Sequence, residues 1–142
     1  MKSSAFVLDC SVVFYWFFDR EPAEAYRYAT AIKKSFEHSD TSAWVPSLWK
    51  IEVLNVLVTA QQRKKITLSE SLSCLTLLAE LPIHVAHEVD ESEVLHLSLE
   101  FGLTAYDATY LALALKKRTP LATLDQALIK AAKKAGVEIY QG

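Results

Sequence analysis

Hydrophobic and polar positions follow two patterns along the chain, one typical of buried strands and one typical of helices. Short apolar runs bounded by polar residues or prolines predict strands at 5–8, 43–45, 82–86, 120–123 and 137–140. The longer stretches between them predict a short helix from Ser11 and further helices at 24–38, 47–65, 67–82, 89–102, 106–118 and 125–136. Strands and helices that alternate in this way favour a mainly parallel central sheet flanked by helices on both faces. We therefore expect a single α/β domain over residues 1–142.

Several helix boundaries carry their own signals. Ser11 is a candidate N-cap for the first helix, and Pro22 suits the first turn of the second. Thr67 and Glu70 have the spacing of a capping box, and Gly102 is placed to end the helix at 89–102. These residues predict where the elements begin and end.

Composition and charge narrow the class of protein. Hydrophobic residues make up 51% of the 142 positions and charged residues 23%, which is typical of a folded globular domain. The net charge of −2 argues against a generally basic nucleic-acid binder, so any contact with nucleic acid must come from local basic patches or from bound metal. Cys10 and Cys74 have neither metal-ligand spacing nor a disulfide framework, and we interpret them as reduced thiols.

The N-terminal apolar run resembles a signal peptide only in part. Asp9 interrupts it, and the acidic segment that follows has no small-residue cleavage site. No apolar stretch reaches the roughly 18 residues of a membrane span. We therefore expect a cytoplasmic protein with no membrane association.

Four acidic residues do not fit the pattern of the core. Asp9 lies inside the apolar run FVLDCSVVFYWFF, where an ionised carboxylate must find partners, a proton or a cation. Asp125 also follows a predicted strand, so the two acids converge if their strands are neighbours. Glu52 lies in an apolar helix, on one face with Asn55 and Thr59. The fourth acid, Asp107, lies in the first turn of another apolar helix.

Each acid, taken alone, also has a purely structural interpretation. Asp9 and Asp125 can cap the helices that follow them. Glu52 can mark an exposed seam of its helix. Asp107, three residues after Thr104, fits a capping box and a favourable place in the helix dipole.

Taken together, the four carboxylates predict a metal site. Gathered at one end of a sheet they would repel one another and raise one another's pKa values, and a divalent cation relieves that repulsion. Oxygen ligands without a Cys or His cluster suit Mg²⁺ or Mn²⁺ better than zinc. Magnesium held by carboxylates is a common arrangement for phosphoryl chemistry.

The same residues carry a family resemblance. The segments VLDCSVVFYWFFDREP, VPSLWKIEVLNVL, LTAYDATYLALAL and PLATLDQAL resemble the successive motifs of a PIN-domain nuclease, and more closely those of a VapC-type toxin from a toxin–antitoxin pair. The resemblance covers essentially the whole chain. It implies a PIN fold and a metal-dependent endoribonuclease that hydrolyses RNA phosphodiester bonds with Mg²⁺ or Mn²⁺.

The resemblance also assigns roles by position. Asp9, Glu52 and Asp107 correspond to the first three family acids, and Asp125 to the less uniform fourth; all four are candidate catalytic and metal-binding residues. Supporting roles in orienting these carboxylates fall to Ser11, Asn55 and Thr123. Cys10 departs from the family's usual small residue.

Partners follow from the resemblance and from local charge. It implies a homodimer and a cognate VapB-type antitoxin, for which the aromatic segment 14–18 and the helix with Tyr26 and Tyr28 are candidate docking surfaces. Basic clusters that could contact RNA phosphates, or simply complement helix dipoles, are Arg63, Lys64 and Lys65; Lys116, Lys117 and Arg118; and Lys130, Lys133 and Lys134.

Two alternatives remain open at this point. A catalytically silent PIN-like scaffold could bind RNA or protein without cutting it. A haloacid-dehalogenase-type phosphatase also places an acid after its first strand, but it needs a second acid where this chain has Ser11.

Overall fold

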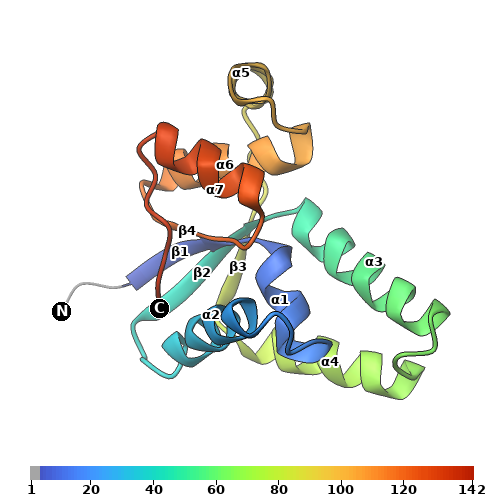
Figure 1. Cartoon of the computed structure of the whole chain (residues 1–142). Coiled ribbons are helices and arrows are strands. Elements are labelled where there is room, and N and C mark those ends of the chain that lie inside the picture. The colour runs from blue at the N-terminus through green and yellow to red at the C-terminus, as the bar shows by residue number, and fades with distance from the viewer. Residues whose placement is uncertain (1–3) are drawn as a thin grey trace.

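The computed structural model describes residues 4–142, which form helices around a small parallel sheet (Figure 1). In chain order the elements are β1 (Ser4–Leu8), α1 (Cys10–Phe17), α2 (Ala23–Ser35), β2 (Thr41–Pro46), α3 (Leu48–Gln62), α4 (Leu68–Glu80), β3 (Ile83–Ala86), α5 (Glu91–Phe101), α6 (Ala105–Lys117), β4 (Leu121–Ala122) and α7 (Gln126–Lys134). The prediction of an α/β domain with a parallel sheet is confirmed.

The sheet has the strand order β3-β2-β1-β4, and every neighbouring pair is parallel. The chain adds β2 and then β3 on one side of β1, and it returns to place β4 on the other side, with Val7 of β1 opposite Leu121. Parallel open sheets bind ligands where the direction of strand addition reverses in this way. The carboxyl ends of β1 and β4 therefore mark the place to look for a site.

β1 is an interior strand of the sheet, and its side chains are apolar on both faces. Phe6, Val7 and Leu8 are completely buried. Such a strand suits a sheet that is covered on both sides. The polar Asp9 ends the run, and α1 begins at the next residue.

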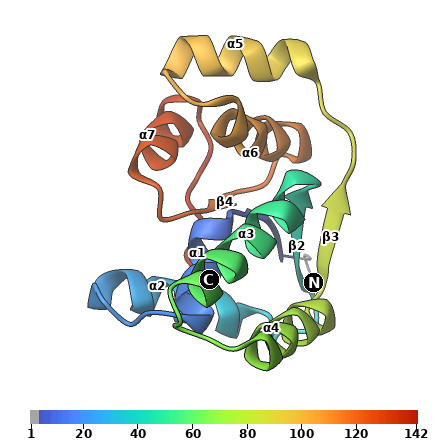
Figure 2. The ribbon, with the colours of Figure 1, turned by 90° about the vertical axis from the view of Figure 1, so that its right-hand side faces the viewer.

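Helices cover both faces of the sheet, as expected. On one face α6 packs on β1, β2 and β4, and α5 and α7 pack against α6. On the other face α1 contacts α2 and α3, and α3 contacts β2 (Figures 1 and 2). The acidic residues are thus carried by elements from both layers.

The helix boundaries agree with most of the sequence signals. Thr67 and Glu70 form the predicted capping box, and Gly102 ends α5 in the left-handed conformation (φ +65°) that favours glycine. We had expected Ser11 to be the N-cap of the first helix, and this prediction is wrong. Asp9 holds that position and Ser11 lies in the first turn, because its hydroxyl is used elsewhere.

The last predicted strand, 137–140, is reduced to a single parallel bridge between Leu121 and Ile139. The Leu121 N–H donates to the Glu138 carbonyl (2.9 Å), and the Tyr140 N–H donates to the Leu121 carbonyl (2.9 Å). β4 has only the two residues Leu121–Ala122, and this short edge limits the pairing of segment 137–140.

Among residues 4–142, no helix is long and apolar enough to cross a membrane.

Candidate active site

The four acids approach one another at the carboxyl end of the sheet. Asp9 directly follows β1 and Asp125 follows β4, and these strands are neighbours. Glu52 comes from α3 and Asp107 from the first turn of α6. Burial is the main cause of the raised pKa values of Asp9, Glu52 and Asp107, and charge repulsion adds to it: Asp9 repels Glu52 and Asp107, and Asp125 repels Asp9 and Asp107. The condition under which the sequence brings Asp9 and Asp125 together, that their strands are neighbours, is met.

Asp9 is the most deeply buried of the four. Only 6% of its surface is exposed, and burial, more than any neighbouring charge, raises its pKa. The hydroxyls of Ser11 and Thr123 both donate to its Oδ2, each at 2.7 Å. Asp9 makes no side-chain capping hydrogen bond to α1, so its carboxylate is directed to these hydroxyls.

The two hydroxyls are themselves fixed by the backbone after β4. Ser11 Oγ accepts from the N–H of Leu124 (3.0 Å), and Thr123 Oγ1 accepts from the N–H of Asp125 (3.1 Å). Each hydroxyl therefore accepts a hydrogen bond from a backbone N–H and donates one to the Asp9 carboxylate. This relay orients Asp9 and ties the end of β1 to the loop after β4.

Glu52 is held by a residue that the sequence reasoning missed. The hydroxyl of Tyr110 donates a hydrogen bond to Glu52 Oε1. Tyr110 lies on α6, one turn after Asp107, and is completely buried. The only signal in the sequence was a hydroxyl-bearing aromatic residue within the aliphatic segment YDATYLALAL.

Asp107 and Asp125 combine a structural role with the acidic site. The Asp107 N–H donates to the Thr104 hydroxyl (3.1 Å), so Thr104 caps α6. Asp125 caps α7 by accepting from the N–H of Leu128 (3.0 Å). Both carboxyl groups are half-buried. The capping interpretation is therefore correct for Asp125, and it coexists with the repulsion between Asp125 and the other acids.

The donor set fits a hard divalent cation. Asp9, Glu52 and Asp107 offer carboxylate oxygens, and burial with mutual repulsion raises all three pKa values, a cost that a cation relieves. Across residues 4–142, no three His, Cys, Asp or Glu side chains are already gathered closely enough to hold an ion by themselves. An ion would therefore keep water ligands beside one or two carboxylates, as Mg²⁺ prefers.

Cys10 is next to Asp9 in sequence but faces the other way. Its side chain lines a small apolar cavity that also receives Cys74, Val53 and Leu78. Burial, followed by the charges of Glu52 and Asp9, raises its thiol pKa to about 12. The thiol is thus protonated and unreactive at neutral pH, which leaves the chemistry of the site to the carboxylates.

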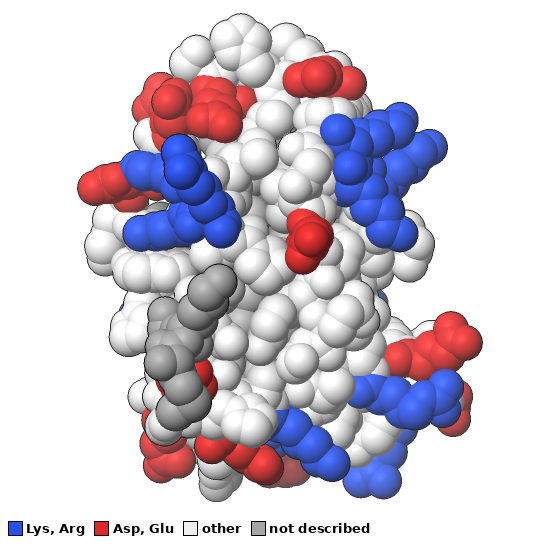
Figure 3. All heavy atoms as spheres, turned by 90° about the vertical axis from the view of Figure 1, so that its left-hand side faces the viewer, with Lys and Arg blue, Asp and Glu red and all other residues white. Residues whose placement is uncertain are grey.

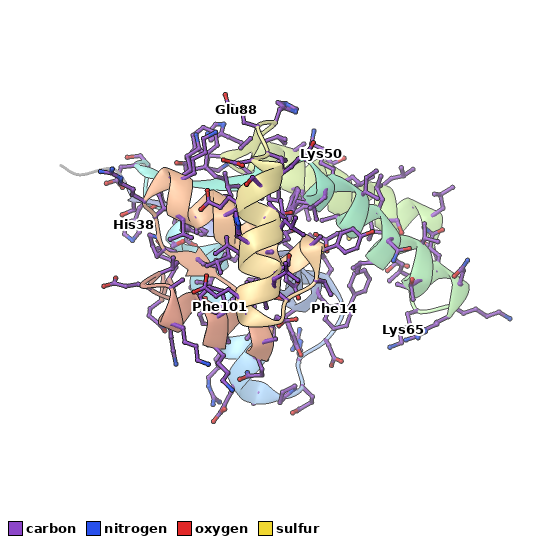
Figure 4. The ribbon with its side chains drawn as sticks, turned by 90° about the horizontal axis from the view of Figure 1, so that it is seen from above. Phe14, His38, Lys50, Lys65, Glu88 and Phe101 are labelled. Atoms are coloured by element: carbon purple, nitrogen blue, oxygen red, sulfur yellow. The ribbon has the colours of Figure 1, made fainter. Side chains whose placement is uncertain are left out.

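The remaining predicted residues lie farther from the acids. Asn55 is exposed and lines a pocket at the outer end of α3 rather than contacting Glu52. Arg63 follows Glu52 by roughly 16 Å along the helix axis, and Lys116 follows Asp107 by roughly 14 Å. In Figure 4 Lys65 lies at the tip of the α3–α4 hairpin, farther out than Phe14. Figure 3 shows basic side chains on another face in separate groups with acidic ones between them.

Comparison with known proteins agrees with this architecture. A family model for the PIN domain matches residues 6–134. The crystal structure of PAE2754 from Pyrobaculum aerophilum superposes with a TM-score of 0.69 over 91% of this chain and 80% of that chain, at 22% sequence identity. A search of curated proteins finds no match. The structural likeness shows the fold, and the family model spans nearly all of the chain and every one of the four acids. This protein belongs to the PIN-domain family.

Proposed function

We propose that this protein is a metal-dependent endoribonuclease that hydrolyses RNA phosphodiester bonds, acting as the toxin of a VapBC-type toxin–antitoxin module in the cytoplasm. PIN domains have a nuclease-like fold that typically uses divalent metal ions. The observation that carries the proposal is the convergence of Asp9, Glu52 and Asp107, each with a raised pKa, at the switch point of the sheet. Ser11, where a phosphatase of the haloacid-dehalogenase type needs an acid, is instead a hydroxyl that donates to Asp9.

Asp9 and Asp107 are the residues that would hold the cation, with Glu52 and Asp125 beside them. A bound Mg²⁺ or Mn²⁺ supplies Lewis acidity to the phosphate and lowers the pKa of water. Ser11 and Thr123 keep the Asp9 carboxylate in one orientation, since both donate to the same oxygen. Tyr110 does the same for Glu52, whose raised pKa suits it to accept a proton from an attacking water.

The path of the RNA is suggested by one face of α3. Glu52, Asn55 and Thr59 share this face, and it continues to Arg63. A pocket of about 180 Å³ at its outer end is lined by Phe14, Phe18, Asn55, Val56, Thr59, Ala60, Arg63 and Lys65. Aromatic rings beside cations can stack a base and contact a phosphate. We assign the strand entering the acidic site to this face.

The toxin assignment brings the expected partners, a cognate VapB-type antitoxin and a second copy of the chain. Exposed apolar side chains support the proposal that these partners cover part of the surface. On α3, Ile51 is 68% exposed, and on α5 Leu99 is 76% exposed. Large apolar side chains exposed in groups often mark interaction surfaces.

The test is cleavage of purified total tRNA by the antitoxin-free protein with Mn²⁺, with EDTA, and with the Asp9→Asn variant. Cleavage that needs Mn²⁺ and is lost in Asp9→Asn supports the proposal. Asp125→Asn tests the less uniform fourth acid in the same assay. Cleavage that persists in Asp9→Asn contradicts the site. RNA binding without cleavage, in protein shown to bind Mn²⁺, favours the catalytically silent scaffold.

A further inference from the structure

β3 is an edge strand with an open side. Among residues 4–142 it pairs with β2 alone, and Figure 2 shows it at the outer edge of the sheet. The Pro82 carbonyl accepts from the Ala43 N–H of β2 (2.9 Å), so the backbone groups of Ile83 and Val85, which alternate with it, face outward. The Ile83 N–H is used by the Leu81 carbonyl (2.8 Å). The Ile83 carbonyl and both backbone groups of Val85 remain for an added strand.

One face of β3 borders an apolar groove. The groove has a volume of about 410 Å³ and is lined by Trp49, Lys50, Val53, Leu54, Leu75, Leu78, Ala79, Leu81, Ile83 and Val85. Trp49 is only 5% exposed, yet its Nε1 has no hydrogen-bond partner among residues 4–142. Buried donors in native proteins are nearly always paired, so this N–H indicates a missing acceptor.

The other face of β3 borders a pocket of different chemistry. It has a volume of about 280 Å³ and is lined by Trp44, Val85, Ala86, His87, Glu88, Leu113, Lys116 and Lys117. Lys117 Nζ lies 3.7 Å from the centre of the Trp44 ring, and the His84 ring lies 5.6 Å from it. The strand therefore separates an apolar groove from a basic, aromatic pocket.

The side chains that line the groove and this pocket carry a net positive charge. Glu88 is the acid in the two linings, and it already forms an ion pair with Lys116. Lys50 and Lys117 remain without an ion pair to any described residue. Figure 4 shows Lys50 and Glu88 on the same side of the molecule. A complementary partner is therefore acidic.

We propose that the open edge of β3 binds an extended, acidic peptide segment of a partner protein as an added strand. Alternate side chains of a strand point to opposite faces, so apolar residues enter the groove and acidic residues enter the pocket near Lys117. Backbone hydrogen bonds to Ile83 and Val85 hold the segment in register. None of the four acids lines the groove or the pocket, so binding at this edge does not depend on nuclease activity.

The experiment measures fluorescence anisotropy of a labelled peptide of about nine residues, long enough for one strand, against the full chain. The probe alternates valine or leucine with aspartate or glutamate. We expect saturable binding that weakens as salt rises. Combined Lys50→Glu and Lys117→Glu substitution weakens it by about tenfold or more. Combined Lys130→Glu and Lys133→Glu substitution on α7, which makes the same charge change away from the edge, leaves it unchanged.

Changes in the peptide test the mode of binding without altering the protein. N-methylation of the residues that face β3 abolishes binding, and N-methylation of the intervening residues is tolerated, because only the first set donates to the strand. The proposal is overturned if a peptide with lysines in place of its acids binds as tightly as the acidic peptide. It is also overturned if N-methylation of either set of residues weakens binding to the same extent. Absence of saturable binding overturns it too. So does a dimer, seen by sedimentation, that excludes the peptide from this edge.

Discussion

The Tyr110 hydroxyl donates a hydrogen bond to Oε1 of Glu52 and so joins α6 to α3 across the acidic site. Burial and the bond to Glu52 raise the pKa of Tyr110, which keeps the phenol protonated and able to donate. The same bond lowers the pKa of Glu52, against the larger effect of burial. Tyr110 therefore acts on the site through the position and charge of Glu52.

Tyr110→Phe should reduce RNA cleavage by about 10- to 100-fold, the usual effect of removing a group that orients a ligand. It should also lower the free energy of unfolding by about 1–3 kcal/mol, because Glu52 loses a buried donor. Cleavage rates and chemical denaturation measure the two effects.

Ser35→Ala is the control, since it removes a buried hydroxyl that donates a hydrogen bond to the Ile32 carbonyl (2.6 Å) on α2. It should lower stability and leave cleavage near the wild-type rate. Equal cleavage by Tyr110→Phe and wild type would contradict the orienting role.

Thr123→Val should weaken Mn²⁺ binding and cleavage by about 10- to 100-fold. The substitution keeps the shape of the side chain but removes the donor to Asp9 Oδ2 and the acceptor for the Asp125 N–H. Titration calorimetry with Mn²⁺ reports the affinity separately from the reaction. Thr76→Val on α4, whose hydroxyl donates to the Leu72 carbonyl, should change neither. Unchanged affinity in Thr123→Val would show that Ser11 alone orients Asp9.

In the absence of metal, Asp9→Asn should be more stable than the wild type, and its advantage should grow with pH. The pKa of Asp9 is raised above its ordinary value of 3.8, so folding favours the protonated form. That contribution is complete below the unfolded-state pKa and is lost as pH rises through the folded-state pKa. Melting temperatures in EDTA at about pH 5 and about pH 8 test the sign. A constant difference between the two proteins would show that the buried carboxylate carries no such cost.

Mn²⁺ should raise the melting temperature of the wild type more at about pH 8 than at about pH 5, because protons compete with the metal for the same carboxylates. Binding to the folded state alone stabilises by about 2.7 kcal/mol at 100 times the dissociation constant. Asp9→Asn should lose most of this shift. An equal shift in wild type and variant would place the binding elsewhere.

Arg63→Glu should weaken RNA binding and make the affinity less steeply dependent on salt, by about one unit of slope for each phosphate that is no longer neutralised. Arg63 and Lys65 line the pocket with Phe14 at the outer end of α3. RNA binding is measured in the Asp9→Asn background, which should not cleave the RNA, at several salt concentrations. This separates affinity from turnover. Lys133→Glu on α7 makes the same charge change on another element. An equal effect of both substitutions would indicate diffuse attraction instead of a defined path.

The local features of this fold were readable from the sequence because each depends on a few adjacent residues. Phe6, Val7 and Leu8 predicted a central strand, and Thr67 with Glu70 predicted a capping box. The acids were found because carboxylates are conspicuous among apolar neighbours. Their relation to the ends of β1 and β4 followed from general rules for parallel sheets.

The contacts that orient the site were not readable, because they join segments far apart in the chain. Tyr110 and Glu52 are separated by 58 positions, and no local pattern relates them. Ser11 looked like a helix cap because its alternative partners, Asp9 and the Leu124 N–H, depend on the pairing of β1 with β4. Asn55 shares a helix face with Glu52, but it lines the outer pocket.

The bond between Thr123 and Asp9 spans 114 positions, and it sets an order of events during synthesis. Asp9 leaves the ribosome early, while Thr123 and Asp125 leave it only after every other strand of the sheet. Until β4 is laid beside β1, the Asp9 carboxylate lacks one of its two hydroxyl donors and the acidic centre is incomplete. A growing chain therefore cannot assemble its complete acidic centre until nearly the whole domain has been made.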